Sequence, residues 1–478
     1  MGIFMNKLKL ALIADLHYYS ETLGTTGEAY ERRSSTDQKC LAESGAIIDA
    51  AFNIIGSSDC DAVLIAGDIS NDGEKVCHRE VIEKIKQLNE KKPVFVVYAT
   101  HDWCCSEDAA RYEGDKVITG DVETMTPPEL REFYFDYGVK DCISEFVHPN
   151  GSSSYCAKIK DGFRLLGLND DKNGKGKAGY TPEHLEWIKQ QLKDAREAGD
   201  TVIGMQHHLL FPCLSELVNG GMLIGDWREM SEELADAGLE LMFVGHSHMQ
   251  RTAEYTSANG NTLYQVNLGS ITGYPAPYTF LTVDEDTAQI DVSTLKNFTY
   301  NGKLLGADYI EAHTLGVVKN LLDNACISKE AFQNQLKSYG IDASKVNIPY
   351  KIIKSLAFHI NNDSVKKAAA KVNALTFGKG IDKKAAAELK DEKLIKYIYE
   401  IFLAVFDGTV HPHAPATPEY RVVSSVAALP KRICSHLPIK ALKSEKMQKI
   451  FNDIEFTLKE LVYPSGLNNY HAVIKRRK

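Results

Sequence analysis

Residues 8–17 read LKLALIADLH, an apolar run that ends in an aspartate and a histidine. A short run of this kind, rich in aliphatic side chains, is typical of a strand that is buried on both faces. Four later runs have the same character, and each of them is also followed by polar side chains. We therefore expect buried strands at 8–14, 62–66, 94–99, 201–205 and 239–244.

Helical patterns lie between these runs, and the alternation of strand and helix indicates α/β layering. The helix expected at 127–136 has a capping box and places Pro127 at its first position. Asn-Gly and Asp-Gly pairs within 144–168 and 252–294 are typical of hairpins, so we expect a mixed sheet or two sheets. Further helices are expected at 38–55, 74–90, 182–198 and 228–237.

Beyond residue 297 the composition becomes rich in Ala, Lys, Leu and Ile at helical spacing. We expect two domains, an α/β domain over 1–297 and a mainly α-helical domain over 298–478. Residues 301–478 hold 28 Lys and Arg against 17 Asp and Glu, a balance of +11, so a formal net charge of −9 leaves −20 for the rest. This asymmetry suggests two bodies with different surroundings. Helices of the second domain are expected at 308–324, 328–338, 363–374, 383–406 and 443–462.

Composition and cysteine usage exclude several classes of protein. With 44% hydrophobic and 25% charged residues among 478, the chain is neither a disordered protein nor a coiled-coil rod. It has no apolar run of about 18 residues, so we expect no membrane-spanning helix. The ten cysteines are scattered without a CxxC pair, and no cleavage site follows the first apolar run. These features predict reduced thiols and a cytoplasmic protein.

The polar residues that follow the apolar runs are of the types that bind metal ions. In α/β proteins, ligand sites form where the carboxyl ends of parallel strands meet. Asp15 and His17, like His246 and His248, are two residues apart, which puts both members of a pair on one side of an extended backbone. Carboxylate and imidazole together suit Zn, Mn or Fe better than Ca. The set comprises Asp15, His17, Asp68, His101, Asp102, His207, His208, His246 and His248.

This set exceeds what one tetrahedral ion needs. Two ions about 3.5–4 Å apart and bridged by one carboxylate account for it better. Such a pair lowers the pKa of bound water from about 16 towards about 7, and it offsets the charge of a phosphoryl group under in-line attack. The pattern therefore favours a site that supplies a hydroxide nucleophile at neutral pH.

The ordered motifs resemble those of the calcineurin-like metallophosphoesterase family, which has D-x-H, G-D-x-x-x-x-G, G-N-H-[DE], H and G-H-x-H. This chain has DLH at 15–17, GDISNDG at 67–73, ATHD at 99–102, HH at 207–208 and GHSH at 245–248. The resemblance covers about 8–295 and is closest in texture to bacterial members similar to cyclic-nucleotide phosphodiesterases. It implies a four-layer αββα sandwich of two mixed sheets flanked by helices, in addition to the C-terminal helical domain.

The resemblance also implies a role for each residue. The first metal would be held by Asp15, His17 and His248, the second by His207 and His246, and both by the bridging Asp68. His101 would stand over the leaving oxygen as general acid or transition-state stabiliser, and Asp102 would orient it. The cofactors would be two divalent or trivalent ions of Mn, Fe or Zn. Neither a substrate-binding residue nor an oligomeric state follows from the sequence.

One position departs from the family pattern, because Thr100 stands where the family has an asparagine that binds the second metal. A hydroxyl is a shorter and weaker metal ligand than an amide oxygen. Three interpretations stay open. The second metal has fewer protein ligands and an extra water, or Thr100 coordinates it, or the second site is weak or empty.

The leading functional hypothesis is a metal-dependent phosphoesterase that acts on a small phosphoester, with a diester favoured over a monoester. A nuclease is the rival enzyme, since the basic helical part could meet a polyanion by releasing counterions, although no nucleic-acid motif supports it. The alternative of another class is a non-catalytic scaffold with a partly decayed metal site. The presence of every metal ligand except the asparagine argues against that alternative.

Overall fold

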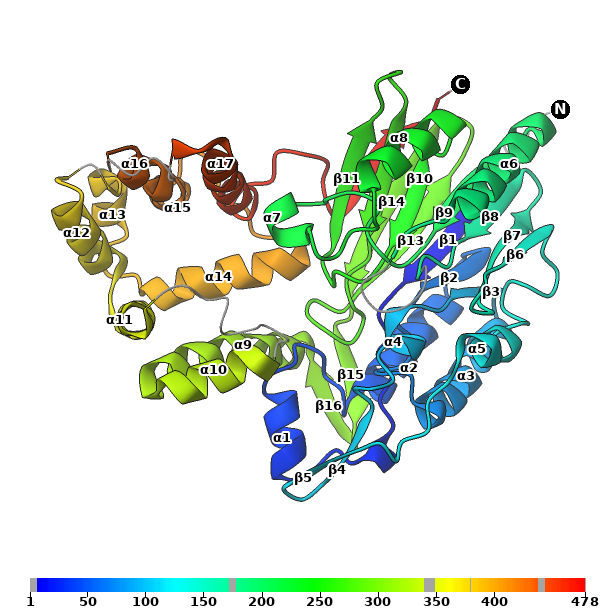
Figure 1. Cartoon of the computed structure of the whole chain (residues 1–478), viewed down its shortest axis with the longest axis horizontal. Helices are drawn as coiled ribbons and strands as arrows, with labels where there is room; N and C mark the ends of the chain where they lie inside the picture. The colour runs from blue at the N-terminus through cyan, green and yellow to red at the C-terminus, as the bar shows by residue number, and fades with distance from the viewer. Residues whose placement is uncertain (1–6, 172–177, 339–348, 379, 437–442, 478) are drawn as a thin grey trace.

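Two large β-sheets lie face to face in the computed structural model, which describes residues 7–171, 178–338, 349–378, 380–436 and 443–477. Helices cover the outer side of each sheet, and a separate group of helices stands to one side of the sandwich (Figure 1). Because side chains alternate along a strand, each sheet can pack one face on the other sheet and the opposite face on helices. The predicted four-layer αββα sandwich with an additional helical region is confirmed.

The first sheet contains the strand formed by the N-terminal apolar run. Its order is β17-β14-β13-β1-β2-β3, in which β1, β2 and β3 are parallel and the other pairings are antiparallel. The register pairs Leu10 with Ala62 and Ile13 with Ile65, so β1 and β2 end at the same edge. The bounds are β1 Leu8–Ile13, β2 Ala62–Ala66, β3 Val94–Val97, β13 Pro277–Val283, β14 Thr287–Thr294 and β17 His471–Lys475.

The second sheet has the order β11-β12-β10-β9-β8-β7-β6. Its central strands β12, β10, β9 and β8 are parallel, and antiparallel strands complete both edges. The expected Asn-Gly and Asp-Gly turns join β6 to β7, β7 to β8 and β11 to β12. The bounds are β6 Ser144–Val147, β7 Ser153–Lys160, β8 Phe163–Gly167, β9 Thr201–Met205, β10 Leu241–Val244, β11 Arg251–Thr256 and β12 Thr262–Asn267.

The hydrophobic core has one part for each interface between layers. Between the sheets, Leu10 and Leu12 of β1 pack with Phe243 of β10, and all three are fully buried. Ile13 points the other way, into the layer formed by α2 and α3. Helices α6 and α8 cover the outer face of the second sheet. These helices are α2 Ser44–Gly56, α3 Lys75–Asn89, α6 Pro182–Ala198 and α8 Trp227–Ala237.

Shorter elements decorate the sandwich. Helix α5 starts at the predicted capping box, where the Thr126 N–H donates to the Glu129 carboxylate at 2.8 Å. Two hairpins, β4 with β5 and β15 with β16, stand apart from the large sheets. The bounds are η1 Glu21–Leu23, α1 Glu28–Ser34, α4 Thr100–Trp103, β4 Ala110–Glu113, β5 Lys116–Thr119, α5 Pro127–Phe133, α7 Glu216–Asn219, β15 Asn297–Tyr300 and β16 Lys303–Gly306.

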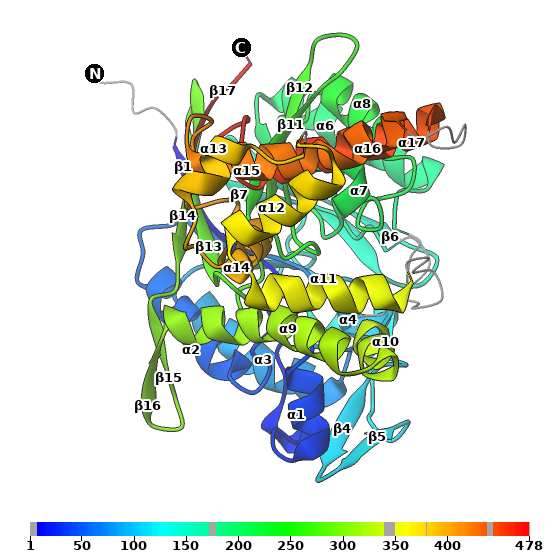
Figure 2. The ribbon, with the colours of Figure 1, turned by 90° about the vertical axis from the view of Figure 1, so that its left-hand side faces the viewer.

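The helical group follows β16 and faces the viewer in Figure 2. The single helix expected at 383–406 is divided into α13 and α14, because the N–H of Leu394 donates to the carbonyl of Asp363 at 3.0 Å instead of continuing a helix. No helix in the described part of the chain is long and apolar enough to cross a membrane. The bounds are α9 Ala307–Ile327, α10 Lys329–Ser338, α11 Tyr350–Asn362, α12 Val365–Leu375, α13 Lys383–Glu388, α14 Leu394–Asp407, α15 Pro418–Ala427, α16 Leu429–His436 and α17 Glu445–Glu460.

The end of the chain returns to the sandwich. Strand β17 pairs antiparallel with β14 (Figure 2). The side chains of Ala472 and Ile474 are buried between the sheets. Arg476 then reaches Glu240, with 3.2 Å between Nε and Oε2. The division into domains at 1–297 and 298–478 stays a prediction, and β17 is the part of the second segment that lies within the first sheet.

Candidate metal centre

The side chains predicted to bind metal lie together at one edge of the sandwich, just past the ends of four parallel strands. In the first sheet, Asp15 and His17 follow β1 and Asp68 follows β2; in the second, His207 follows β9, and His246 and His248 follow β10. Both sheets therefore deliver ligands to the same place.

Five of these six residues have a left-handed backbone conformation. The φ angles are 53° at Asp15, 40° at His17, 51° at Asp68, 63° at His246 and 56° at His248. A residue other than glycine adopts this conformation at a cost of about 1–3 kcal/mol, and such residues cluster where the fold holds a functional side chain in place. The chain thus turns sharply after each of these strands and aims the side chains at one another.

The first group consists of Asp15, His17 and His248, whose ligand atoms all lie within 4.8 Å of one another. The Nε2 atoms of His17 and His248 are 3.0 Å apart, and the Nε2 atom of His248 is 3.3 Å from Oδ1 of Asp15. Burial lowers the pKa of His17 well below its usual value, which favours the neutral imidazole that binds metal. The side chains of these three residues can hold one cation between them.

The second group consists of Asp68, His207 and His246. The distance from Oδ2 of Asp68 to Nε2 of His207 is 3.0 Å. The same carboxylate oxygen is 3.8 Å from Nε2 of His17 in the first group. Asp68 therefore stands between the two groups, where one carboxylate can serve two ions.

Unpartnered buried atoms test whether these residues fit metal ions. Among the described residues, Oδ2 of Asp68 and Nε2 of His207 are buried and have no hydrogen-bond partner. Buried polar atoms in folded proteins are normally satisfied, so these two neighbouring atoms, which form no well-aligned hydrogen bond, indicate a ligand that both can contact. Imidazole and carboxylate donors are suited to transition metals, and the residues fit the pair of ions that the sequence predicts.

Partners behind the ligands fix their orientation. Nδ1 of His207 lies 2.9 Å from the carbonyl oxygen of Ala66, so it donates there and turns Nε2 towards Asp68. The amide of Gln38 contacts Nδ1 of His248. The backbone N–H of His246 donates to the Asp15 carboxylate at 3.1 Å. Asp15, His207 and His248 are thus each oriented by a contact with a neighbouring group.

His101 stands beside the two groups, on the short helix α4. Its backbone N–H donates to Oδ1 of Asp68 at 2.8 Å, and its ring lies 4.9 Å from that of His17. Nδ1 is 3.0 Å from Oδ1 of Asp72 and 2.5 Å from the carbonyl oxygen of Asn71. Burial opposes protonation, but the Asp68 and Asp72 carboxylates outweigh it and raise the pKa of His101 well above its usual value.

The Asp102 carboxylate does not contact the imidazole of His101, which the family resemblance implied that it would orient. Its carboxylate accepts hydrogen bonds from the backbone N–H groups of Ile69 and Ser70, both at 2.9 Å, and of Ala99 at 2.7 Å. It therefore joins the loops after β2 and β3, and Asp72 is the side chain that contacts His101. The position of Asp72, four residues after Asp68 in GDISNDG, is the sequence signal that could have indicated it.

Thr100 belongs to a further polar cluster that the sequence did not predict. Its hydroxyl donates to Oδ1 of Asp171 at 2.9 Å and lies 3.2 Å from Nε2 of His208. Nδ1 of His208 is in turn 3.1 Å from Oδ1 of Asp170. The rings of His208 and His246 are 4.2 Å apart, so this cluster abuts the second group. The adjacent acids at 170 and 171, following an apolar run, were the available signal.

Carboxylate and imidazole side chains placed for two neighbouring ions are typical of two-metal phosphoester hydrolases. A sequence profile of the calcineurin-like phosphoesterases matches residues 8–250, about half of the chain, and the chain belongs to that family. The recognition made from the motifs is confirmed, and so is its consequence that the protein is a phosphoester hydrolase. No curated protein sequence matches the chain significantly.

Solved structures with a similar arrangement include two phosphatases. A dimetal phosphatase from Danio rerio has 16% identity and a TM-score of 0.41, over 60% of this chain and 96% of its own. A purple acid phosphatase from yellow lupin seeds has 12% identity and a TM-score of 0.41, over 63% of this chain and 53% of its own. At this level of similarity neither structure bears on the substrate.

Proposed function

We propose that this phosphoester hydrolase is a phosphodiesterase with two transition-metal ions that share the Asp68 carboxylate. The observation that best supports the shared site is the position of Oδ2 of Asp68, 3.0 Å from His207 in one group and 3.8 Å from His17 in the other. The preference for a diester rests on the resemblance of the sequence motifs to those of bacterial family members similar to cyclic-nucleotide phosphodiesterases. Mn, Fe and Zn all suit the donor set.

In this proposal the bound ions, His101 and Asp102 have separate roles in the reaction. The bound ions would lower the pKa of a water molecule and offset the charge of the phosphoryl group. His101 holds a proton at the leaving oxygen through Nε2, because Asp72 and Asn71 already occupy Nδ1. The bond from the His101 N–H to Asp68 fixes this acid relative to the shared carboxylate. Asp102 supports His101 and Asp68, because its carboxylate joins the two loops that carry these residues.

For Thr100 we propose that it does not coordinate the second metal, which has fewer protein ligands and an extra water. Its hydroxyl is engaged with Asp171 and His208, so the second ion would have one protein ligand fewer than in family members that carry the asparagine. Asp68, His207 and His246 supply that set.

The test is reconstitution of the full chain with Mn, Fe or Zn, followed by metal analysis and hydrolysis of bis(p-nitrophenyl) phosphate and p-nitrophenyl phosphate. We expect close to two equivalents of metal and faster turnover of the diester. His101→Ala should keep its metal and lose about 10²–10⁴ in rate, whereas Asp68→Ala should lose both metal and activity. Asp59→Ala, at an exposed carboxylate, is the matched control.

Two results would count against the proposal. A chain that binds no metal and hydrolyses neither ester is not a two-metal hydrolase. A chain that hydrolyses the monoester faster than the diester keeps the metal assignment and loses the diester preference.

A further inference from the structure

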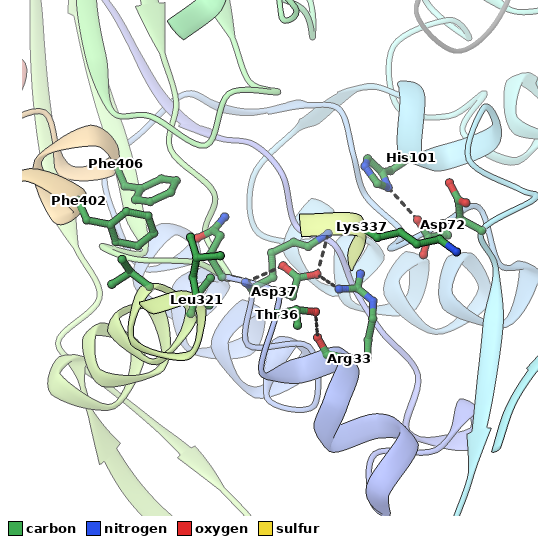
Figure 3. A pocket seen from close by; sticks show the side chains of 14 residues that line it. Arg33, Thr36, Asp37, Asp72, His101, Leu321, Lys337, Phe402 and Phe406 are labelled. Atoms are coloured by element: carbon green, nitrogen blue, oxygen red, sulfur yellow. Dashed lines mark hydrogen bonds and ion pairs between the residues drawn. The ribbon is translucent and has the colours of Figure 1, made fainter. Parts of the chain in front are cut away.

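A cavity of about 770 Å³ opens beside His101 and is bounded by both parts of the chain (Figure 3). Its polar side carries Arg33, Lys39 and Asp72 from the sandwich. The helical group supplies Lys337 of α10 and an apolar side of the cavity. That side consists of Val317, Val318 and Leu321 of α9 and Phe402 and Phe406 of α14.

Helix α14 is fixed to the loop that carries a metal ligand. The N–H of Gln250, two residues after His248, donates to the carbonyl of Phe406 at 2.7 Å. The guanidinium of the next residue, Arg251, donates to the carbonyl of Ala404 at 2.8 Å. Because both bonds go to the backbone beside Phe406, the ring of Phe406 has a defined position relative to the metal groups.

Helix α9 is fixed to the polar side in a similar way. Nε2 of His313 lies 2.9 Å from the carbonyl oxygen of Asp37, and the amide of Asn320 donates to the carbonyl of Ser35 at 3.1 Å. The Asp37 carboxylate holds Arg33 at 2.5 Å and Lys39 at 3.5 Å. One short segment thus joins the apolar wall to the cations that face it.

We infer that the leaving alcohol of the substrate carries an aromatic group, which binds against Phe402 and Phe406. This inference rests on the proposed function, in which His101 gives a proton to the leaving oxygen. Since His101 lines the same cavity, an alcohol that departs past its imidazole enters the space in front of the two phenylalanines. The helical group is therefore the part of the chain that selects the substrate.

The geometry of the wall favours a ring over an aliphatic chain. The rings of Phe402 and Phe406 are 5.4 Å apart at an interplanar angle of 78°. Such a perpendicular pair offers both a face and an edge to a third ring, and aromatic groups prefer stacked or edge-to-face contacts. Figure 3 shows both rings on α14 across the cavity from His101 and Asp72.

The experiment compares two diesters whose alcohols have similar acidity, dibenzyl phosphate and bis(2-methoxyethyl) phosphate. For the metal-loaded full chain we expect kcat/KM to favour the benzyl ester by about tenfold or more. In the double variant Phe402→Ala with Phe406→Ala this ratio should fall towards one. Phe358→Ala, at an exposed phenylalanine of the same helical group, should leave the ratio unchanged.

A second measurement guards against a folding defect. Phe402→Leu with Phe406→Leu keeps most of the apolar volume and removes only the rings, and it should lower the ratio as well. Calorimetric titration with benzyl methylphosphonate and 2-methoxyethyl methylphosphonate should show the same preference in binding. A wild-type ratio near one, or an unchanged ratio in a folded double variant, would overturn the inference. Failure to hydrolyse bis(p-nitrophenyl) phosphate, assayed beside the two esters, would instead overturn the proposed function.

Discussion

Oδ1 of Asp72 lies 3.0 Å from Nδ1 of His101, and the carbonyl oxygen of Asn71 lies 2.5 Å from the same nitrogen. Both partners are acceptors, so the proton of Nδ1 is held there and Nε2 faces the site. In Asp72→Asn an amide that can donate competes for the other tautomer. We expect kcat to fall by about 10–100-fold, with KM and metal content little changed.

Steady-state kinetics and metal analysis on the same preparation check this prediction. Asp59→Asn is the control, since its carboxylate is largely exposed. Asp72 also forms a group with His101 and Cys105 that is compact enough for an ion. Loss of a metal equivalent in Asp72→Asn would therefore show that Asp72 is a ligand and not a positioning residue.

The link between Thr100 and Asp171 separates the interpretations of the unusual threonine. Thr100→Val keeps the shape of the side chain and removes the hydroxyl that donates to Asp171 at 2.9 Å. The buried carboxylate loses a donor, so we expect the free energy of unfolding to fall by about 1–3 kcal/mol. The number of bound metal ions should stay the same. Urea unfolding and metal analysis measure the two quantities.

Thr256→Val is a suitable control, because Thr256 is exposed on β11. A variant Thr100→Val that keeps its stability and loses one metal equivalent would favour direct coordination by the hydroxyl instead.

The residues proposed to bind metal could be found in the sequence because each follows its apolar run within a few residues. Strand ends are local features of a sequence, and parallel strands bring their ends together. The contact between Asp72 and His101 depends on how two separate loops fold over each other, which local pattern does not show. Asp102 was the nearer carboxylate in sequence, but the short helix α4 places it under the backbone of Ile69 and Ser70.

The last strand was missed for a related reason. HAVIK at 471–475 is short, ends in basic residues and lies far along the chain from its partner β14. Such a segment has no pattern of its own strong enough to distinguish an edge strand from a tail. Only the register with β14 shows that Ile474 faces the core.

A buried histidine predicts how stability changes with pH. His184 stacks on Phe146 and Trp187, and among the described residues neither of its ring nitrogens has a hydrogen-bond partner. Burial holds its pKa well below the usual value of 6.5. The folded state therefore resists a proton that the unfolded state takes up, and stability is lost as pH falls below about 6.5.

The corresponding change is His184→Phe, which cannot take up a proton in either state. Urea unfolding at pH 7.5 and 5.5 should show a smaller loss for the variant, by about 1 kcal/mol. His411→Gln, at an exposed histidine, should behave like the wild type. An equal loss in wild type and His184→Phe would mean that other groups cause the acid sensitivity.

The pairing of β17 with β14 leads us to expect that residues 471–475 stabilise the β-sandwich, although most of the sandwich is formed by the first part of the chain. Ile474 is 3% exposed and packs between the sheets, whereas its neighbour Val473 is 63% exposed on the other face of the same strand. Ile474→Ala should lower the free energy of unfolding by about 2–4 kcal/mol, and Val473→Ala should change it by less than about 0.5 kcal/mol. The three tryptophans, at 103, 187 and 227, all lie in the sandwich, so their fluorescence during denaturation reports its unfolding. If the sandwich did not depend on residues beyond 297, neither variant would change the free energy of unfolding measured by this fluorescence.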